Sequence, residues 1–249
     1  AGKVSGSVLK QALGPDFTPE DAVRIGTAEG KLIASIDGMR SFIADDYLMA
    51  RIATRHALGD LLVSGARPQH ILLNLALPPA NEHILTRRLQ NTIKGVEYEA
   101  NLHGASLAGG HSMEASDWLI SLAIMGAENT NPIPKRIHSG PAAFVLTDAI
   151  GVGTMMAAQM HGAINVQQYD QLLTHLVRDM VDMGELQKSH PILAATDVTG
   201  FGIAGHLLEM LNFESHGVSW TDTALPALTG ALETARSYPS SILQANQIY

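Results

Sequence analysis

The chain of 249 residues contains no cysteine, which excludes disulfide bonds and thiolate metal sites within these residues. It also lacks any apolar run of the roughly 18 residues that a membrane-spanning helix requires. Its first residues do not combine a charged segment with a following apolar one, so they do not resemble a secretory leader. Since 46% of the residues are hydrophobic, enough for a substantial core, we expect a soluble, cytoplasmic protein of one large domain or two ordinary ones.

A basic surface is missing as well. The sequence has 24 Asp and Glu residues against 16 Lys and Arg residues, a formal net charge of −8, and no run of basic residues. Nucleic acids are bound largely through clustered Lys and Arg side chains that neutralise phosphates. The composition therefore argues against a nucleic acid partner, and we expect neither nucleic acid nor a membrane among the partners of this protein.

Two carboxylates in the first quarter of the chain are placed against apolar surfaces. The alternation in KLIASID predicts a half-buried strand at 31–37, with Asp37 at its last position. A helix at about 45–64 then carries Asp60 on the same face as its apolar residues. A carboxylate buried there is costly unless it is paired, protonated or coordinated to a cation. Asp60 could instead accept a backbone hydrogen bond or end the helix beside a glycine, so a structural role and a metal site both stay open.

Apolar periodicity predicts the remaining elements. We expect further strands at 67–77, 118–125, 144–148 and 190–197, a short strand that runs from Ala105 into Gly109 and Gly110, and further helices within 1–14 and at 82–103, 151–160, 167–183, 202–211 and 226–237. The segment ENTNPIPKRIHSGP contains three prolines and is the candidate domain boundary. The sequence thus predicts a two-domain α/β chain, with an N-terminal domain of residues 1–137 and a C-terminal domain of residues 138–249.

Four aspartates could share a divalent cation, namely Asp21, Asp37, Asp60 and Asp197. Asp197, like Asp37, follows an apolar run that is typical of a strand. Mg²⁺ is usually held by one or two carboxylates together with phosphate oxygens of a substrate. Two carboxylates about 4 Å apart repel each other by roughly 4 kcal/mol at an effective dielectric constant near 20, so their convergence is tolerable only around cations. The pattern predicts a site for a divalent metal and phosphate.

Glycine turns after two predicted strands could supply backbone N–H groups to phosphate oxygens. They are Gly109–Gly110 and Gly200–Gly202. His111, which follows the first pair, could be a ligand, an acid or a packed residue, whereas His206 lies on an apolar helix face and is expected to be a core histidine. The P-loop motif GxxxxGK[ST] is absent. Together with the aspartates, these features favour phosphoryl transfer from a nucleotide.

Five segments, EDAVRI, SIDGMRSFIADD, RIATRHALGD, GGHSME and TDVTGFGIAGHLLEM, occur in that order and together resemble the selenide, water dikinase (selenophosphate synthetase) family of the AIR-synthase-like superfamily. The resemblance covers nearly the whole chain. It implies a two-domain AIR-synthase-like α/β (α+β) fold, in which the N-terminal mixed sheet forms a barrel with a second copy in a homodimer and the C-terminal α/β domain is incomplete here. It also implies that ATP, selenide and water are converted into selenophosphate, AMP and phosphate.

The resemblance further implies roles for individual residues. Mg²⁺ would be held by Asp21, Asp60 and Asp197. Lys3 would be the catalytic lysine, and ATP would be contacted by Lys3, Asp37, Asp60, Gly109, Gly110 and His111. Since the family's nucleophilic cysteine or selenocysteine would sit one residue before Ala1, we expect this chain to be trimmed from a longer product.

Two departures separate the sequence from the family pattern. Asp148 replaces a lysine in the family's TKPLG run, which is TDAIG here, and Gly38–Met39 replace an aromatic pair after Asp37. They leave two alternatives to an active dikinase. One is a sister ATP-dependent enzyme of the superfamily, such as thiamine-monophosphate kinase, and the other is a non-catalytic nucleotide-binding homologue.

Overall fold

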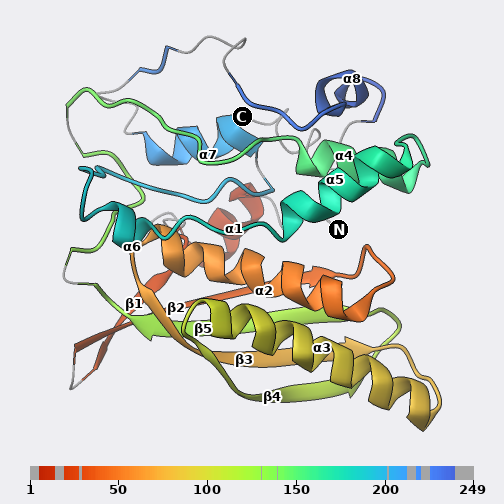
Figure 1. The fold of residues 1–249 in the computed structure, drawn as a ribbon. Helices are drawn as coiled ribbons and strands as arrows, with labels where there is room; N and C mark the ends of the chain where they lie inside the picture. The colour runs from red at the N-terminus through yellow and green to blue at the C-terminus, as the bar shows by residue number, and fades with distance from the viewer. Residues whose placement is uncertain are drawn as a thin grey trace. The chain divides into compact units, whose positions relative to one another are not determined.

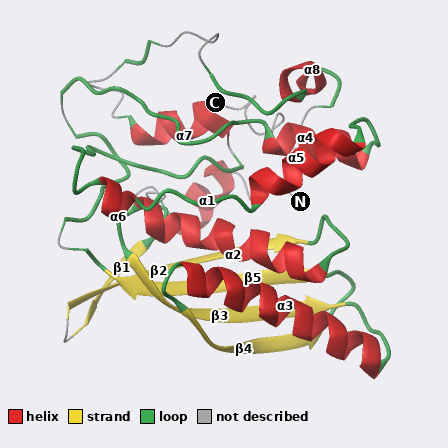
Figure 2. Cartoon of the chain, in the orientation of Figure 1, coloured by secondary structure: helices red, strands yellow, loops and turns green. Residues whose placement is uncertain are grey.

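The computed structural model describes residues 6–14, 20–27, 30–129, 131–138, 140–200, 202–211, 217–219 and 225–238. The chain divides into two compact units. We call residues 20–134 and 179–197 the sheet unit, and residues 1–19, 135–178 and 198–249 the helical unit. Figures 1 and 2 show the elements of both units. The domain boundary at residue 137 stays a prediction.

The sheet unit is built on five strands in the spatial order β1-β2-β5-β3-β4. They are β1 (Val23–Thr27), β2 (Gly30–Arg40), β3 (Arg67–Leu77), β4 (Ser106–Glu114) and β5 (Leu119–Ala127). β3 and β4 are parallel and every other neighbouring pair is antiparallel, so the sheet is mixed. A parallel pair needs a crossover connection, and helix α3 (Glu82–Leu102) supplies it. Among the described strands, β1 and β4 are open edges, so this sheet is not closed.

Helix α3 and helix α2 (Asp46–Val63) lie on one face of this sheet (Figure 1). Both helices begin as the sequence predicts, because Asp45 and Asn81 accept hydrogen bonds from backbone N–H groups of the first turns. The strand side chains that point toward the helices include the fully buried Ile71, Leu75, Ile120, Leu122 and Ile124. This layer of sheet against helices forms the core of the sheet unit.

The two helices approach each other closely at Gly95. A Cβ atom at this position would overlap the backbone oxygen of Tyr47, so only glycine fits there. One turn further along α3, Glu99 is fully buried and accepts hydrogen bonds from Arg51 Nε at 2.7 Å and from Arg55 Nη1 at 3.0 Å. These contacts join α2 to α3 on the sheet.

The opposite face of the sheet is not covered by either long helix. Strand side chains alternate between the two faces, and those that point away from α2 and α3 remain partly exposed. Two large apolar side chains among them are Ile36, which is 73% exposed, and Leu72, which is 41% exposed. The sheet unit therefore presents a partly apolar surface on this side.

The helical unit contains α1 (Gly6–Leu13), α4 (Val152–Met160), α5 (Val166–Leu176), α7 (Gly202–Met210) and α8 (Ala231–Ala235). A core cluster in its described part consists of Met155, Leu172 and Ala231, which come from α4, α5 and α8. An isolated parallel bridge joins Ile150 to Ala227. Across both units, the described residues include no helix of the length and apolar character needed to cross a membrane.

Three predictions about strands are wrong. The segments 144–148 and 190–197 are loops, because neither pairs with a neighbouring strand in the described part of the chain. Asp37 does not end its strand either. β2 continues to Arg40, since β5 pairs with it along its whole second half. An apolar run predicts that a segment is extended, but a strand also needs a hydrogen-bonding neighbour.

Two helices are shorter than predicted. The helix predicted at 167–183 ends at Leu176, because the chain beyond residue 178 belongs to the sheet unit and forms only the short helix α6 (Met183–Leu186), which contacts α2. The helix predicted at 226–237 begins only at Ala231. Gly230, just before it, adopts φ +86°, a left-handed conformation that a helix interior does not allow.

Candidate functional site

Three aspartates from distant parts of the sequence converge in the sheet unit. Asp21 precedes β1, Asp60 lies on α2, and Asp197 lies in the loop that follows α6. Each offers one carboxylate oxygen, and these three oxygens lie within 4.8 Å of one another. All three side chains are partly buried. We call them the carboxylate cluster; they are three of the four aspartates that the sequence singles out.

Electrostatics in the cluster are unfavourable when no cation is present. Burial of Asp60 and the nearby charge of Asp197 raise the pKa of its carboxyl from the ordinary 3.8 to about 7, with smaller contributions from Asp21 and Asp37. A hydrogen bond from Ser35 Oγ to Asp60 Oδ2 opposes this rise. Asp60 does not end its helix, which continues to Val63.

The fourth aspartate, Asp37, lies outside the carboxylate cluster. Its Oδ2 atom is 2.7 Å from His56 Nε2 on α2, and its Oδ1 atom accepts a hydrogen bond of 2.7 Å from the Gly38 backbone N–H. At the other end of the cluster, Thr196 Oγ1 donates a hydrogen bond of 2.9 Å to Asp21 Oδ2. Polar partners thus surround the carboxylates from β2, α2 and the loop before Asp197.

Ser35 and His56 are the residues that sequence reasoning missed. Both could have been found from periodicity, because Ser35 and Asp37 are two positions apart on one strand face and His56 and Asp60 are one helical turn apart. When α2 packs on β2, these two pairs must meet. The signal is therefore a polar residue that precedes a candidate carboxylate by two positions on a strand or by one turn on a helix.

The pair Gly109–Gly110 is not a turn, which corrects the prediction made for it. Both glycines lie inside the edge strand β4, and the register with β3 shifts just before them, leaving Ala108 without an opposite residue. A Cβ atom at Gly110 would overlap the Leu73 backbone oxygen, so this glycine permits the close pairing of β4 with β3. His111 is exposed, so it is not a packed residue.

In the helical unit, the segment GFGIAG at 200–205 has the spacing GxGxxG and opens α7. It does not follow a strand, so it lacks the context of a dinucleotide-binding motif. His206 on α7 is 4% exposed, and its Nε2 atom accepts a hydrogen bond of 3.1 Å from the Thr199 backbone N–H. Its predicted role as a core histidine is confirmed. Lys3 lies outside the described residues.

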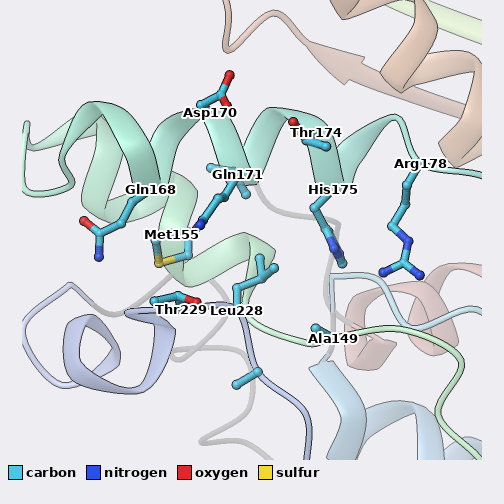
Figure 3. A pocket seen from close by; sticks show the side chains of 12 residues that line it. Ala149, Met155, Gln168, Asp170, Gln171, Thr174, His175, Arg178, Leu228 and Thr229 are labelled. Atoms are coloured by element: carbon cyan, nitrogen blue, oxygen red, sulfur yellow. The ribbon is translucent and has the colours of Figure 1, made fainter.

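Asp148, which departs from the family pattern, is paired within the helical unit. Its Oδ1 atom lies 2.6 Å from Arg178 Nη1 and 3.5 Å from His175 Nδ1, and it accepts a hydrogen bond of 2.7 Å from the Ala149 N–H. Burial lowers the pKa of His175, with Asp148 opposing that shift. Figure 3 shows His175 and Arg178 pointing from the end of α5 toward a groove of about 640 Å³ that Leu228 lines from the other side.

The pKa of Asp60 predicts how the stability of the metal-free protein depends on pH. The folded-state pKa of about 7 lies above the unfolded value near 3.8, so the folded state binds more protons between these values. Stability is therefore greatest at low pH within this range and falls as the pH rises through about 7. In melting curves recorded in chelator, Asp60→Asn should remove this loss and melt higher than the unmodified protein at pH 8 by about 4–8 °C, which corresponds to about 2 kcal/mol.

A matched control is Asp170→Asn, since Asp170 is exposed on α5. It should leave the difference in melting temperature between pH 5 and pH 8 unchanged. If Asp60→Asn and Asp170→Asn give the same pH profile, Asp60 is not the group that titrates near neutrality.

Comparison with known proteins agrees with the fold and with the sequence motifs. Residues 19–127 match the N-terminal domain of AIR synthase related protein, and residues 137–237 match its C-terminal domain. A selenide, water dikinase of Aeromonas salmonicida is 32% identical over 211 residues, which are 83% of this chain and 59% of that protein. The chain therefore spans less than two thirds of that relative's length.

Solved structures with less than 25% identity share the fold. Thiamine monophosphate kinase from Aquifex aeolicus matches with a TM-score of 0.67 at 15% identity, over 96% of this chain and 82% of the kinase. AaThiL complexed with AMPPCP and TMP matches with a TM-score of 0.72 at 15% identity, over 96% and 79% of the two chains. The resemblance and the α/β fold class that the sequence predicts are thereby confirmed. Because both domains match in the same order, the chain belongs to the AIR synthase related proteins.

Proposed function

We propose that this chain is part of an ATP-dependent selenide, water dikinase, which makes selenophosphate, AMP and phosphate from ATP, selenide and water. The observation that carries the proposal is the convergence of Asp21, Asp60 and Asp197 in a chain whose sequence is similar to selenide, water dikinases. Enzymes that transfer phosphoryl groups work mainly by positioning and by neutralising charge, and a cluster of carboxylates around a divalent cation is suited to both. A cytoplasmic location is part of the same proposal.

The residues present fit Mg²⁺. Carboxylate oxygens are the hard ligands that Mg²⁺ prefers. The raised pKa of Asp60 reflects its burial first and then the nearby charge of Asp197, and a bound cation would relieve this charge repulsion. Asp21, Asp60 and Asp197 would hold the ion, and the bound ion would neutralise and orient the phosphates of ATP. Around it, the nucleotide contacts that we propose from the resemblance are Asp37, Gly109, Gly110, His111 and Lys3.

The first prediction of the proposed function concerns the reaction. The natural full-length protein that contains these residues, given ATP, Mg²⁺ and selenide without oxygen, should form AMP, orthophosphate and a selenium-bound phosphate, followed by ³¹P NMR and nucleotide chromatography. ADP as the final product, with thiamine monophosphate phosphorylated instead, would assign a sister kinase. ATP binding without any turnover would assign the non-catalytic homologue.

The second prediction concerns the carboxylate cluster. Asp60→Asn and Asp197→Asn keep the side-chain shape but remove a negative charge, so Mg²⁺–ATP should bind at least tenfold more weakly, a loss of about 1.4 kcal/mol. Saturation at 100 times Kd stabilises a protein by about 2.7 kcal/mol, so the rise in melting temperature on adding Mg²⁺–ATP should fall to about half or less. Metal-free stability should hold or rise slightly in Asp197→Asn and should rise in Asp60→Asn as described above for pH 8, because carboxylate repulsion is relieved.

Asp170→Asn is the control for this experiment too, and it should keep the full shift with Mg²⁺–ATP. A structural aspartate predicts the reverse pattern, because replacing a buried acceptor leaves hydrogen bonds unmade. If both cluster variants lose metal-free stability yet keep the full ligand-induced shift, the metal assignment is wrong.

The third prediction concerns assembly. We propose that two copies pair through the strands of their sheet units into a symmetric dimer barrel that encloses the uncovered sheet face. An isologous twofold contact is the commonest way to cover exposed sheet edges, and it would also cover this partly apolar surface. Sedimentation velocity at micromolar concentration should then show a dimer. Ile36→Glu, in the uncovered face, should shift it to monomer, whereas Val166→Glu, an equally exposed apolar position at the start of α5, should not. A monomer at all concentrations would refute the pairing.

A further inference from the structure

Helix α2 faces β2 through two polar pairs in succession. On β2, Ser35 and Asp37 share a face, and on α2, His56 and Asp60 are one turn apart. Ser35 donates a hydrogen bond to Asp60, while His56 Nε2 lies 2.7 Å from Asp37 Oδ2. The two pairs lie next to each other between the strand and the helix. The aspartate of the first pair, Asp60, belongs to the carboxylate cluster, whereas the aspartate of the second pair, Asp37, does not.

Each oxygen atom of Asp37 has its own partner. The Gly38 backbone N–H donates to Oδ1 at 2.7 Å, and the His56 ring lies against Oδ2. The side chains of His56 and Asp37 are 28% and 20% exposed, so the pair is shielded enough to be stable but is still open to solvent and to a ligand. Two hydrogen bonds in different directions fix the plane of a carboxylate.

Asp37 is close enough to the cluster to interact with it, since its charge helps to raise the pKa of Asp60. Even so, its oxygens are not among those that lie within 4.8 Å of one another in the cluster. A carboxylate so near a divalent cation would gain by turning toward it, because a third or fourth anionic oxygen strengthens binding of a hard cation. When a cation is bound, the contacts of Asp37 with His56 and with the Gly38 N–H must compete with this gain.

We propose that His56 is a positioning residue that holds Asp37 away from the divalent cation, so that the cation is bound by Asp21, Asp60 and Asp197 alone. This inference rests on the proposed function, since it deepens the account of the same site. It implies that Asp37 is reserved for a hydrogen-bond donor of the substrate, such as a hydroxyl or an amino group, because a carboxylate repels phosphate oxygens. His56 thereby limits both the ligand number and the charge of the metal site.

The test measures Mn²⁺ binding in the absence of nucleotide, by electron paramagnetic resonance of the free ion and by calorimetry. Mn²⁺ accepts the same oxygen ligands as Mg²⁺. His56→Leu removes the donor and keeps a bulky side chain, so Asp37 is released and Mn²⁺ should bind about tenfold more tightly. His56→Gln keeps an N–H donor at similar reach and should bind Mn²⁺ as the unmodified protein does.

The double variant His56→Leu with Asp37→Asn separates this explanation from a direct charge effect. The tenfold gain in Mn²⁺ affinity should vanish in the double variant, because the released Asp37 carboxylate is gone. A gain that persists would mean that His56 itself repels the cation, and the inference would be overturned. Asp37→Asn alone should leave Mn²⁺ affinity nearly unchanged. A large loss in that variant would show that Asp37 already binds the ion, which also overturns the inference.

These outcomes are distinct from failure of the proposed function. If the protein makes no selenophosphate but the Mn²⁺ results are as expected, the inference about His56 stands and the reaction assignment falls. If His56→Leu lowers the melting temperature of the metal-free protein without changing Mn²⁺ affinity, then the pair only joins α2 to β2. Asp60→Asn serves as the positive control, since it should weaken Mn²⁺ binding in every background.

Discussion

The burial of α2 is the constraint on which the sheet unit and its site depend. Eleven residues of this helix are buried, among them Thr54 and Arg55, so it has almost no face left for water. A helix in that position must satisfy its polar side chains within the protein: Thr54 Oγ1 donates to the Ala50 backbone oxygen of the same helix, and the charged side chains bond neighbouring elements. The polar residues of α2 are therefore placed by their partners, and the partners differ on its two sides.

On the side toward α3, α2 presents cations. Arg51 and Arg55 both bond Glu99, and the Arg51 guanidinium also lies 4.4 Å from the centre of the Tyr98 ring. On the side toward β2, α2 presents His56 and Asp60. The arginines are held by Glu99, so they do not reach across the helix to offset Asp60. Burial and the charge of Asp197 raise the pKa of Asp60, and this separation of charge across the helix leaves the two arginines of α2 without a part in opposing that rise.

Convergence of the three aspartates also requires that the chain return from the helical unit to the sheet unit. Asp21 and Asp60 lie in the first quarter of the sequence, but Asp197 reaches them only because residues 179–197 belong to the sheet unit. This return explains why the helix expected to continue to residue 183 stops at Leu176. Local periodicity favours a longer helix there, and tertiary packing against α2 overrides it.

The sequence predicted those features that depend on local periodicity and missed those that depend on neighbours. The strands before and after α3 and the two long helices follow from their apolar spacing, and Asp60 was identified because it interrupts an apolar helix face. The extent of β2 beyond Asp37 depends on pairing with β5, which no local pattern encodes. The same holds for the segments 144–148 and 190–197, which pair with no strand in the described part of the chain and leave Phe144, Val145 and Leu193 exposed. It also holds for His56, whose importance arises only where α2 crosses β2.

The replacement at residue 148 can be understood in the same physical terms. Asp148 has a backbone N–H, a guanidinium and an imidazole around one oxygen. A lysine there, as the family pattern has, would face Arg178 as a second cation with no carboxylate between them, and like charges at such distances repel. Acidic Asp148 and basic Arg178 therefore form a matched pair in this chain. The departure is accounted for by pairing within the helical unit, so it does not by itself argue that the carboxylate cluster in the sheet unit has lost its function.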